Sequence, residues 1–191
     1  MKMPSFDLVI VGVGGQGTLL SSKILGDAAL RMNCEVKVSE VHGMAQRGGS
    51  VITHVRVGEK VHAPLVSLGQ ADYVVAFEAL EAARAAEFLK PGGVLIVNTQ
   101  EIWPMPVIMG NAAYPENCLE PLAATHPVEA MDALQMAIAS GSQRAVNLVL
   151  LGALSKYLPW NQEVWEAAIA ACVPPKTLTV NLAAFKAGAA Q

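Results

Sequence analysis

The chain has 191 residues, of which 53% are apolar and 15% charged, and its formal net charge is −3 at pH 7. This length suits one domain with a substantial core, and the scattered Lys and Arg residues exclude a basic nucleic-acid-binding face. The longest apolar run, at 145–154, is too short to span a membrane, and Asp7 interrupts any signal-peptide core. We therefore expect a cytoplasmic protein.

The low charged fraction has two explanations, a surface hidden against a partner or an alanine-rich α/β interior. The three cysteines, Cys34, Cys118 and Cys172, lie dozens of residues apart and form no CxxC pair. An iron–sulfur cluster normally needs four thiolates, several of them closely spaced. The chain is therefore expected to hold no cluster by itself and to keep its cysteines reduced.

Strand-like apolar runs alternate with helical periodicity along the first hundred residues, and helices dominate the last sixty. In chain order the pattern predicts strand 6–11, helix 18–32, strand 35–39, strand 51–57, a hairpin turn at 58–59 into strand 60–62, strand 71–77, helix 80–89, strand 94–98, a looser stretch 103–127 with a short strand near 107–109, and helices 128–140, 144–157, 162–171 and 177–187.

Continuous Val, Ile and Leu strands separated by helices are typical of a parallel sheet that is covered on both faces. We therefore predict an α/β fold with a doubly wound, mainly parallel, Rossmann-like sheet and a helical C-terminal part. No internal repeat or linker divides the sequence, so residues 1–191 are expected to form a single domain.

The first candidate site is the glycine loop between the first strand and the first helix. Its residues are Gly12, Gly14, Gly15, Gln16, Gly17 and Thr18. The helix start offers free backbone amides to an anion. The spacing also fits the G-x-G-x-x-G fingerprint of dinucleotide-binding folds, with Glu40 as the acidic residue after the second strand. That fingerprint recurs in unrelated α/β proteins, and the glycines could equally serve tight packing of the helix on the sheet.

A second candidate site follows the second strand. It comprises Glu40, His42, Gln46, Arg47, Gly48 and Gly49. Ligands of open α/β sheets bind at the carboxyl ends of the strands, and an Arg guanidinium is suited to a carboxylate or phosphate. We expect this loop to face a ligand or another chain; the alternative is a solvated loop in which Glu40 pairs with Arg47.

Two polar residues occur at the start of the apolar stretch near position 150. Arg144 could bind an anion or lie at the surface. Asn147 lies inside an otherwise apolar helix, so its amide should satisfy a neighbouring backbone group or cross an interface. Of these two roles for Asn147, we favour the structural one.

Taken together, GVGGQG at 12–17 and SEVHGMAQRGGSV at 39–51 resemble the gamma-domain family of 2-oxoacid:ferredoxin (acceptor) oxidoreductases, in the form of its indolepyruvate branch. The segments SGSQRAVNLVLLGAL at 140–154 and NLAAFKAG at 181–188 are also similar to that family. The resemblance extends from Asp7 to Gly188 and therefore covers nearly the whole chain.

The resemblance implies a subunit of an enzyme that decarboxylates an aryl 2-oxoacid, transfers the acyl group to coenzyme A and reduces ferredoxin. Thiamine diphosphate, Mg²⁺ and [4Fe–4S] clusters would be held by a larger partner subunit, because this sequence lacks a GDG…N thiamine motif and cluster cysteines. It implies that the glycine loop meets coenzyme A or the partner, and that the second loop faces the catalytic subunit. We predict no catalytic residue and no metal site in this chain.

Two other functions stay open at this stage. A stand-alone NAD-dependent dehydrogenase would use the glycine loop and Glu40 for its cofactor. A non-catalytic assembly module would use the same loops only as an interface. When isolated from its partner, the chain could also form a homodimer through surface meant for that partner.

Overall fold

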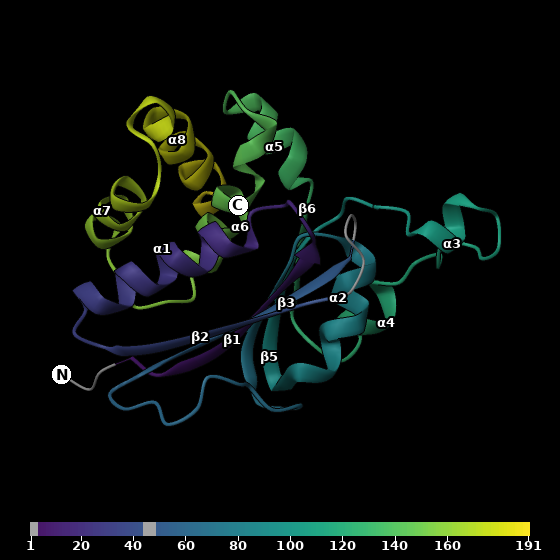
Figure 1. Ribbon diagram of the computed structural model, residues 1–191, viewed down its shortest axis with the longest axis horizontal. Coiled ribbons are helices and arrows are strands. Elements are labelled where there is room, and N and C mark those ends of the chain that lie inside the picture. The colour runs from purple at the N-terminus through teal and green to yellow at the C-terminus, as the bar shows by residue number, and fades with distance from the viewer. Residues whose placement is uncertain (1–3, 44–48) are drawn as a thin grey trace.

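The computed structural model describes residues 4–43 and 49–191. At its centre is a six-stranded sheet in the order β2-β3-β1-β4-β5-β6 (Figure 1). β3 pairs antiparallel with both β2 and β1, whereas β4, β5 and β6 continue parallel to β1. The strands are β1 Phe6–Val13, β2 Glu35–His42, β3 Ser50–Gly58, β4 Ala71–Ala76, β5 Leu89–Asn98 and β6 Val128–Met131.

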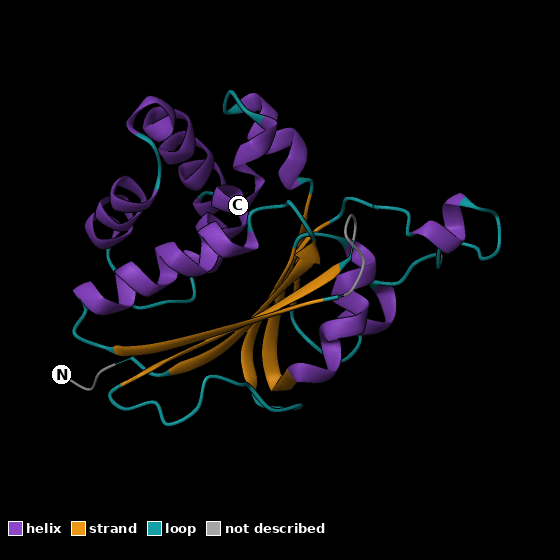
Figure 2. Ribbon diagram, viewed as in Figure 1, coloured by secondary structure: helices purple, strands orange, loops and turns teal. Residues whose placement is uncertain are grey.

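Helices cover both faces of the sheet, which lies between the two sets in Figure 2. α1 and α5–α8 lie on one face, and α2 and α4 lie on the other (Figure 1). The helices are α1 Thr18–Arg31, α2 Ala79–Ala85, α3 Met105–Ile108, α4 Glu120–Ala123, α5 Ala133–Ala139, α6 Val146–Ser155, α7 Gln162–Cys172 and α8 Leu178–Ala189, with 3-10 turns η1 Ala86–Phe88, η2 Gln143–Ala145 and η3 Pro175–Thr177. The predicted doubly wound, mainly parallel fold with a helical C-terminal part is confirmed.

The apolar run of β1 shows why the sheet is covered twice. Successive side chains of a strand point to opposite faces. Leu8 and Ile10 belong to the core beneath α1 and α6, whereas Val9 and Val11 belong to the core beneath α2. All four are at most 1% exposed. A strand with no polar alternation is therefore stable only between two layers of helices.

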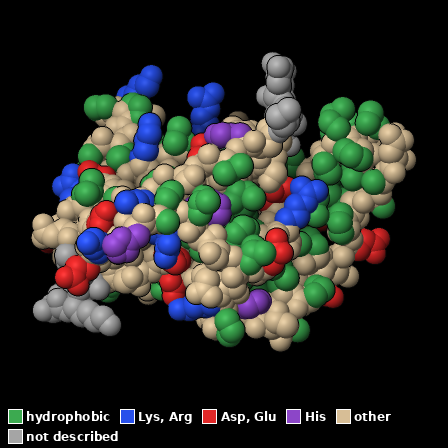
Figure 3. Space-filling model, turned by 60° about the horizontal axis from the view of Figure 1, so that its bottom comes forward, with side chains coloured by type: hydrophobic (Ala, Val, Ile, Leu, Met, Phe, Trp, Pro, Cys, Tyr) green, Lys and Arg blue, Asp and Glu red, His purple; other side chains and the backbone are tan. Residues whose placement is uncertain are grey.

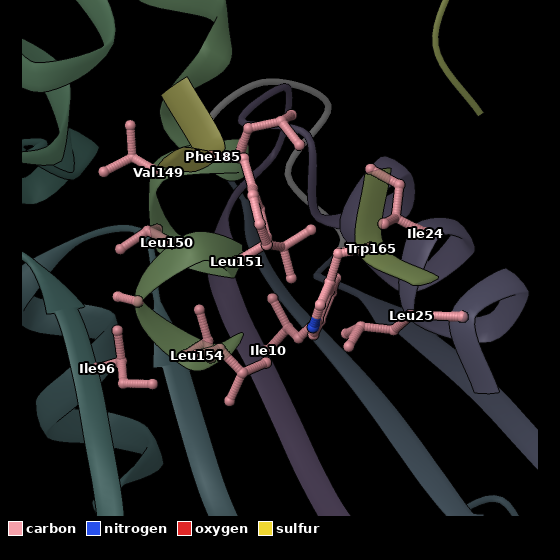
Figure 4. Close-up of a cluster of buried hydrophobic side chains, with 14 of the residues drawn as sticks. Ile10, Ile24, Leu25, Ile96, Val149, Leu150, Leu151, Leu154, Trp165 and Phe185 are labelled. Atoms are coloured by element: carbon pink, nitrogen blue, oxygen red, sulfur yellow. The ribbon is translucent and has the colours of Figure 1, made fainter. Parts of the chain in front are cut away.

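The larger core is centred on α6, where every residue from Val146 to Leu154 is buried. Figure 4 shows Trp165 of α7 between Leu25 of α1 and Leu154 of α6, above Ile10 of β1. The Trp165 ring also packs against Phe185 of α8, with ring centroids 5.4 Å apart. This cluster joins the four helices α1, α6, α7 and α8 to the sheet.

Three predicted elements are wrong, two of them because a partner in the fold overrides the local pattern. The predicted strand at 60–62 is loop, since β3 already pairs on both edges and the Val61 amide donates to the Glu35 carboxylate at 2.9 Å. The start of the predicted helix at 128–140 is the edge strand β6, and the helix begins only after Asp132, which caps it. The predicted strand near 107–109 is replaced by α3, because prolines in a first helical turn favour helix.

In the described ranges, no helix combines the length and the apolar character that a membrane crossing requires.

Two glycines allow the backbones of α6 and α8 to touch. A Cβ added to Gly188 would lie 1.9 Å from the Val149 carbonyl oxygen, and one added to Gly152 would lie 2.0 Å from the Phe185 carbonyl oxygen. Real side-chain carbons never approach backbone so closely, so the helices would have to separate. The packing of α6 therefore depends on the absence of side chains at these two positions.

Gly188→Ala is expected to lower the free energy of unfolding by about 3 kcal/mol or more, because the added methyl forces α8 away from α6. Urea-induced unfolding of the isolated chain measures the change. The control is Gly26→Ala in α1, where an added Cβ meets nothing within 4 Å. That change should raise the stability by about 0.5–1 kcal/mol through helix propensity. Equal effects of the two substitutions would contradict the packing argument.

Candidate functional site

The glycine loop joins the end of β1 at Val13 to the start of α1 at Thr18. Gly15 and Gly17 have φ angles of 97° and 94°, a region that favours glycine. These two residues turn the chain sharply out of the sheet and into the helix. Gly14 is not constrained in this way, since only the Gly49 carbonyl oxygen, 3.8 Å away, would meet its Cβ.

The Gln16 side chain points back into the molecule and braces the loop. Its Oε1 accepts from the Val13 amide at 2.7 Å, and its Nε2 donates to the Phe77 carbonyl at 3.2 Å. Gly12 leaves room for this arrangement, because a Cβ there would lie 2.7 Å from the Gln16 Oε1. The amide of Gln16 thereby links the end of β1 to the residue that follows β4.

The first turn of α1 presents its backbone amides without a cap. Gly17 occupies the N-cap position, and among the described residues no side chain accepts from the first amides. The first N–H groups of a helix have no partner within the helix, and the positive end of its dipole lies there. This start of α1 also lies where neighbouring strands β1 and β4 lead to helices on opposite faces, the usual ligand position in open α/β sheets (Figure 1).

A pocket of 400 Å³ opens beside this helix start. It is enclosed by the glycine loop, the segment after β5, α5, and the beginning of α6. Its lining residues are Gly15, Gln16, Gly17, Leu20, Gln100, Ile102, Leu134, Gln143, Arg144, Val146 and Asn147. Free amides, the Arg144 guanidinium and side-chain amides converge there, so the pocket is suited to a group rich in anionic or carbonyl oxygens.

Asn147 is the most informative residue of this pocket. Its side chain is 1% exposed, yet its Nδ2 has no hydrogen-bond partner among the described residues. It lies directly under the loop, with its Cγ 3.4 Å from the position of a Cβ on Gly17. A buried donor without an acceptor costs about 1–3 kcal/mol, so such groups call for a specific explanation. Contrary to the structural role expected for this amide, its Nδ2 satisfies no backbone group of the described residues.

The second loop is described only in part. Glu40 lies near the end of β2. Its carboxylate accepts from Thr53 Oγ1 at 2.8 Å and pairs with His42 Nε2 at 2.8 Å. The His42 side chain is 63% exposed. Gly49 connects the two candidate loops, because its carbonyl accepts from the Gly14 amide at 3.0 Å. Gln46, Arg47 and Gly48 lie outside the described residues.

Thr18 connects the glycine loop to Glu40 as well. Its hydroxyl lies 3.5 Å from the Glu40 Oε2, on the side of α1 that faces β2. A separate hollow of 430 Å³ runs along this side, lined among others by Thr18, Lys23, Glu40 and His42. The glycine loop is therefore accessible from two sides, one bearing a guanidinium and the other a carboxylate.

This geometry disfavours Glu40 as the acidic residue of a dinucleotide-binding site. In the dinucleotide fold the acidic residue ends the strand next to β1. Here β3 lies between β1 and β2, which moves Glu40 two strand spacings, about 10 Å, away from β1. The carboxylate is also engaged by Thr53 and His42. A ribose hydroxyl would have to displace these partners.

Two buried carboxylates after β4 were not among the predicted site residues: Glu78 and Glu81, which are 1% and 4% exposed. Glu78 caps α2 by accepting from the Glu81 amide at 2.8 Å, and its other oxygen accepts from the Ile102 amide and the Tyr114 hydroxyl. Burial, with the hydrogen bond to Glu78, raises the pKa of Tyr114. Glu78 could have been found from the sequence, because it directly follows a predicted buried strand.

Glu81 completes this network. Its carboxylate accepts from the Ser50 hydroxyl at the start of β3 and pairs with Arg84 at 2.6 Å. In residues 4–43 and 49–191, no three His, Cys, Asp or Glu side chains converge as metal ligands. The glutamates therefore tie loops together at the carboxyl edge of the sheet.

Gln100 and Gln143 of the pocket were also missed, although Gln100 follows a predicted buried strand.

The orphaned amide of Asn147 leads to a prediction about stability. Asn147→Leu should leave the isolated chain as stable as before or stabilise it by about 1 kcal/mol, because it removes a buried unpaired donor. Thermal and urea unfolding measure the effect. The control is Asn98→Leu, also fully buried but bonded to the Phe77 carbonyl at 3.1 Å and the Ala133 amide at 3.0 Å. It should destabilise by about 2–3 kcal/mol. A similar loss for both variants would mean that Asn147 is bonded in solution.

Comparison with known proteins gives the family. The protein-family model described as pyruvate ferredoxin/flavodoxin oxidoreductase matches residues 7–191. The chain is 42% identical over 194 residues to the indolepyruvate oxidoreductase subunit IorB of Thermococcus kodakarensis, covering 97% of this chain and 95% of that protein. It is 43% identical over 187 residues to the protein of the same name from Archaeoglobus fulgidus, covering 95% and 92%.

Solved structures show the same fold at low identity. The pyruvate oxidoreductase subunit PORC of Thermotoga maritima aligns with a TM-score of 0.74 at 22% identity, covering 100% of this chain and 97% of that one. The 2-oxoglutarate:ferredoxin oxidoreductase of Magnetococcus marinus aligns with a TM-score of 0.76 at 21% identity, covering 100% of this chain and 31% of that longer chain. The resemblance carried by the two loops is confirmed: the chain belongs to the pyruvate ferredoxin/flavodoxin oxidoreductase family.

Proposed function

We propose that this chain is the small subunit of an indolepyruvate-type 2-oxoacid:ferredoxin oxidoreductase. It is a single gamma-type domain over residues 1–191 and works in the cytoplasm. The observation that carries the proposal is the identity of 42% to an indolepyruvate oxidoreductase subunit over nearly the full length of both proteins. A second support is that the same fold makes up 31% of a longer oxidoreductase chain, where it is joined to further polypeptide.

The redox chemistry belongs to a larger subunit in this proposal. That subunit holds thiamine diphosphate, Mg²⁺ and [4Fe–4S] clusters, decarboxylates an aryl 2-oxoacid and passes electrons to ferredoxin, while coenzyme A accepts the acyl group. The small chain contributes binding surface and shape to the joint active site. It is therefore inactive alone, and its residues act by holding and orienting groups.

The pocket beside the glycine loop is where we place the contact with coenzyme A. The phosphates and amide carbonyls of coenzyme A accept hydrogen bonds. They match three groups of donors in the pocket: the uncapped first turn of α1, the Arg144 guanidinium and the unpartnered Nδ2 of Asn147. The backbone at Gly15 and Gly17 allows close approach, and Gln16 holds the loop in place. Gly12, Gly14 and Thr18 complete the loop that frames this contact.

The second loop, with Glu40, His42, Gln46, Arg47, Gly48 and Gly49, is proposed to face the larger subunit. The exposed His42 and the hydrogen bond from Gly14 to Gly49 support this, because they place the described ends of the loop at the same sheet edge as the pocket. A partner bound there would share the coenzyme A channel with this chain.

Activity should appear only when the two subunits are combined. The purified chain alone should show no 2-oxoacid-dependent reduction of ferredoxin or a viologen dye under anaerobic conditions. Addition of the purified larger subunit should produce coenzyme A-dependent reduction with indolepyruvate, and lower kcat/KM with pyruvate. Activity of the chain alone, or no gain of activity on mixing, would refute the proposed function.

The coenzyme A contact is tested in the reconstituted enzyme. Asn147→Leu and Arg144→Ala should each raise the KM for coenzyme A about tenfold, the loss expected for one strong contact of about 1.4 kcal/mol. The KM for the 2-oxoacid should stay within twofold. Gly26→Ala, far from the pocket lining, serves as the control and should leave both constants unchanged. An unchanged KM for coenzyme A in both variants would remove the pocket from the coenzyme A path.

A further inference from the structure

A second feature of the carboxyl edge has no role in the proposed coenzyme A contact. Residues 102–114 leave the end of β5, extend away from the sheet and return, with α3 at their outer end (Figure 1). We call this segment the arm. It contains no charged residue.

The arm exposes large apolar side chains at a density that a free surface rarely shows. Trp103, Met105, Ile108 and Met109 are 57%, 58%, 61% and 59% exposed. Figure 3 shows the corresponding gathering of hydrophobic side chains at the right-hand end of the molecule, where Figure 1 places α3. Contiguous apolar surface of this kind is typical of a protein interface.

The arm is held in one conformation by its own backbone and by one buried carboxylate. The Pro104 carbonyl accepts from the Val107 and Ile108 amides at 2.9 and 3.1 Å, and the Pro106 carbonyl accepts from the Asn111 amide at 2.8 Å. Both ends of the arm meet Glu78 Oε1, which accepts from the Ile102 amide at 3.1 Å and the Tyr114 hydroxyl at 2.5 Å. A projection that is ordered before it binds loses little conformational entropy on docking.

The inner side of the arm is hollowed. Met105 and Ile108 line a pocket of 220 Å³ together with Leu80 and Arg84 of α2. Arg84 pairs with the buried Glu81 at 2.6 Å, so its charge is already matched. The surface therefore offers both an apolar projection and a cavity that could receive a side chain of a partner.

The sequence on both sides of the arm carries acidic side chains and no Lys or Arg. The sequence has no Lys or Arg from position 91 to position 143, whereas Glu101, Glu116 and Glu120 flank the arm and are exposed. Two copies meeting through their arms would bring these acids together, and an anionic lipid surface would repel them. The partner that fits has an apolar groove bordered by basic residues.

We propose that the arm docks into an apolar groove with a basic rim on the larger subunit of the oxidoreductase. The inference rests on the proposed function, which supplies that subunit, and it adds a contact separate from the two loops. Apolar side chains at the centre of the contact supply affinity, and the acidic flanks guide orientation and association.

The test measures affinity between the purified chain and the purified larger subunit, anaerobically, by titration calorimetry or sedimentation. Ile108→Glu and, separately, Met105→Glu should each weaken binding at least tenfold. Both side chains are exposed, so the thermal midpoint of the isolated chain should stay within about 2 °C. The matched control is Leu30→Glu on α1, a position that is 63% exposed. It should bind like the unchanged chain.

Each outcome decides one question. If the unchanged chain binds and both arm variants bind equally well, the arm inference is overturned while the proposed function stands. If the unchanged chain fails to bind the larger subunit, the proposed function itself fails, and the arm inference with it. Loss of self-association in the arm variants, with unchanged binding to the larger subunit, would assign the arm to a second copy and also overturn the inference. Slowed amide hydrogen exchange over residues 103–112 in the complex would support it independently.

Discussion

The backbones of α6 and α8 touch at Gly152 and Gly188, and this contact sets the position of α6 in the larger core. It lets α6 be buried on every side, so that this helix can form the centre of the larger core. A helix buried in this way has one depth and one rotation relative to the sheet, because close-packed interiors tolerate little displacement. Its first turn is thereby placed under the glycine loop, where Asn147 meets Gly17. The polar end of the pocket is therefore a consequence of apolar packing further along the same helix.

Side-chain carboxylates and amides that bond to neighbouring backbone organise the described part of the sheet's carboxyl edge. Gln16 ties the end of β1 to the residue after β4, and Glu78 ties the start of α2 to the arm. Buried polar groups of this kind are stable only when their partners are complete. The loops at this edge are therefore positioned by satisfied hydrogen bonds, and Asn147, whose amide nitrogen is left without a partner, differs from them in kind. This difference is why the proposed coenzyme A contact is built on Asn147 and not on Gln16.

Much of the fold could be predicted from the sequence because its signals are local. The unbroken apolar runs of β1 and β4 require cover on both faces, and the glycine loop after β1 indicates the turn into α1. The edge strand β6 could not be predicted in this way, since its four residues are strand only because β5 supplies a parallel partner. The position of β3 between β1 and β2 was equally hidden, because strand order depends on contacts distant in sequence. That order is what separates Glu40 from the strand on which a dinucleotide site would depend.

The family, the α/β class and the two loops could be predicted from residue types at short spacing along the chain. Which polar groups have partners depends on the packing of segments that are distant in sequence. Gln16 and Glu40 are chemically capable of holding a ligand, but neighbours from other strands engage them. Asn147 stands out because its amide nitrogen has no acceptor among the described residues. The arm stands out because it extends away from the sheet. Hydrogen-bond satisfaction and exposure are properties of packed neighbours, and no pattern along the chain records them.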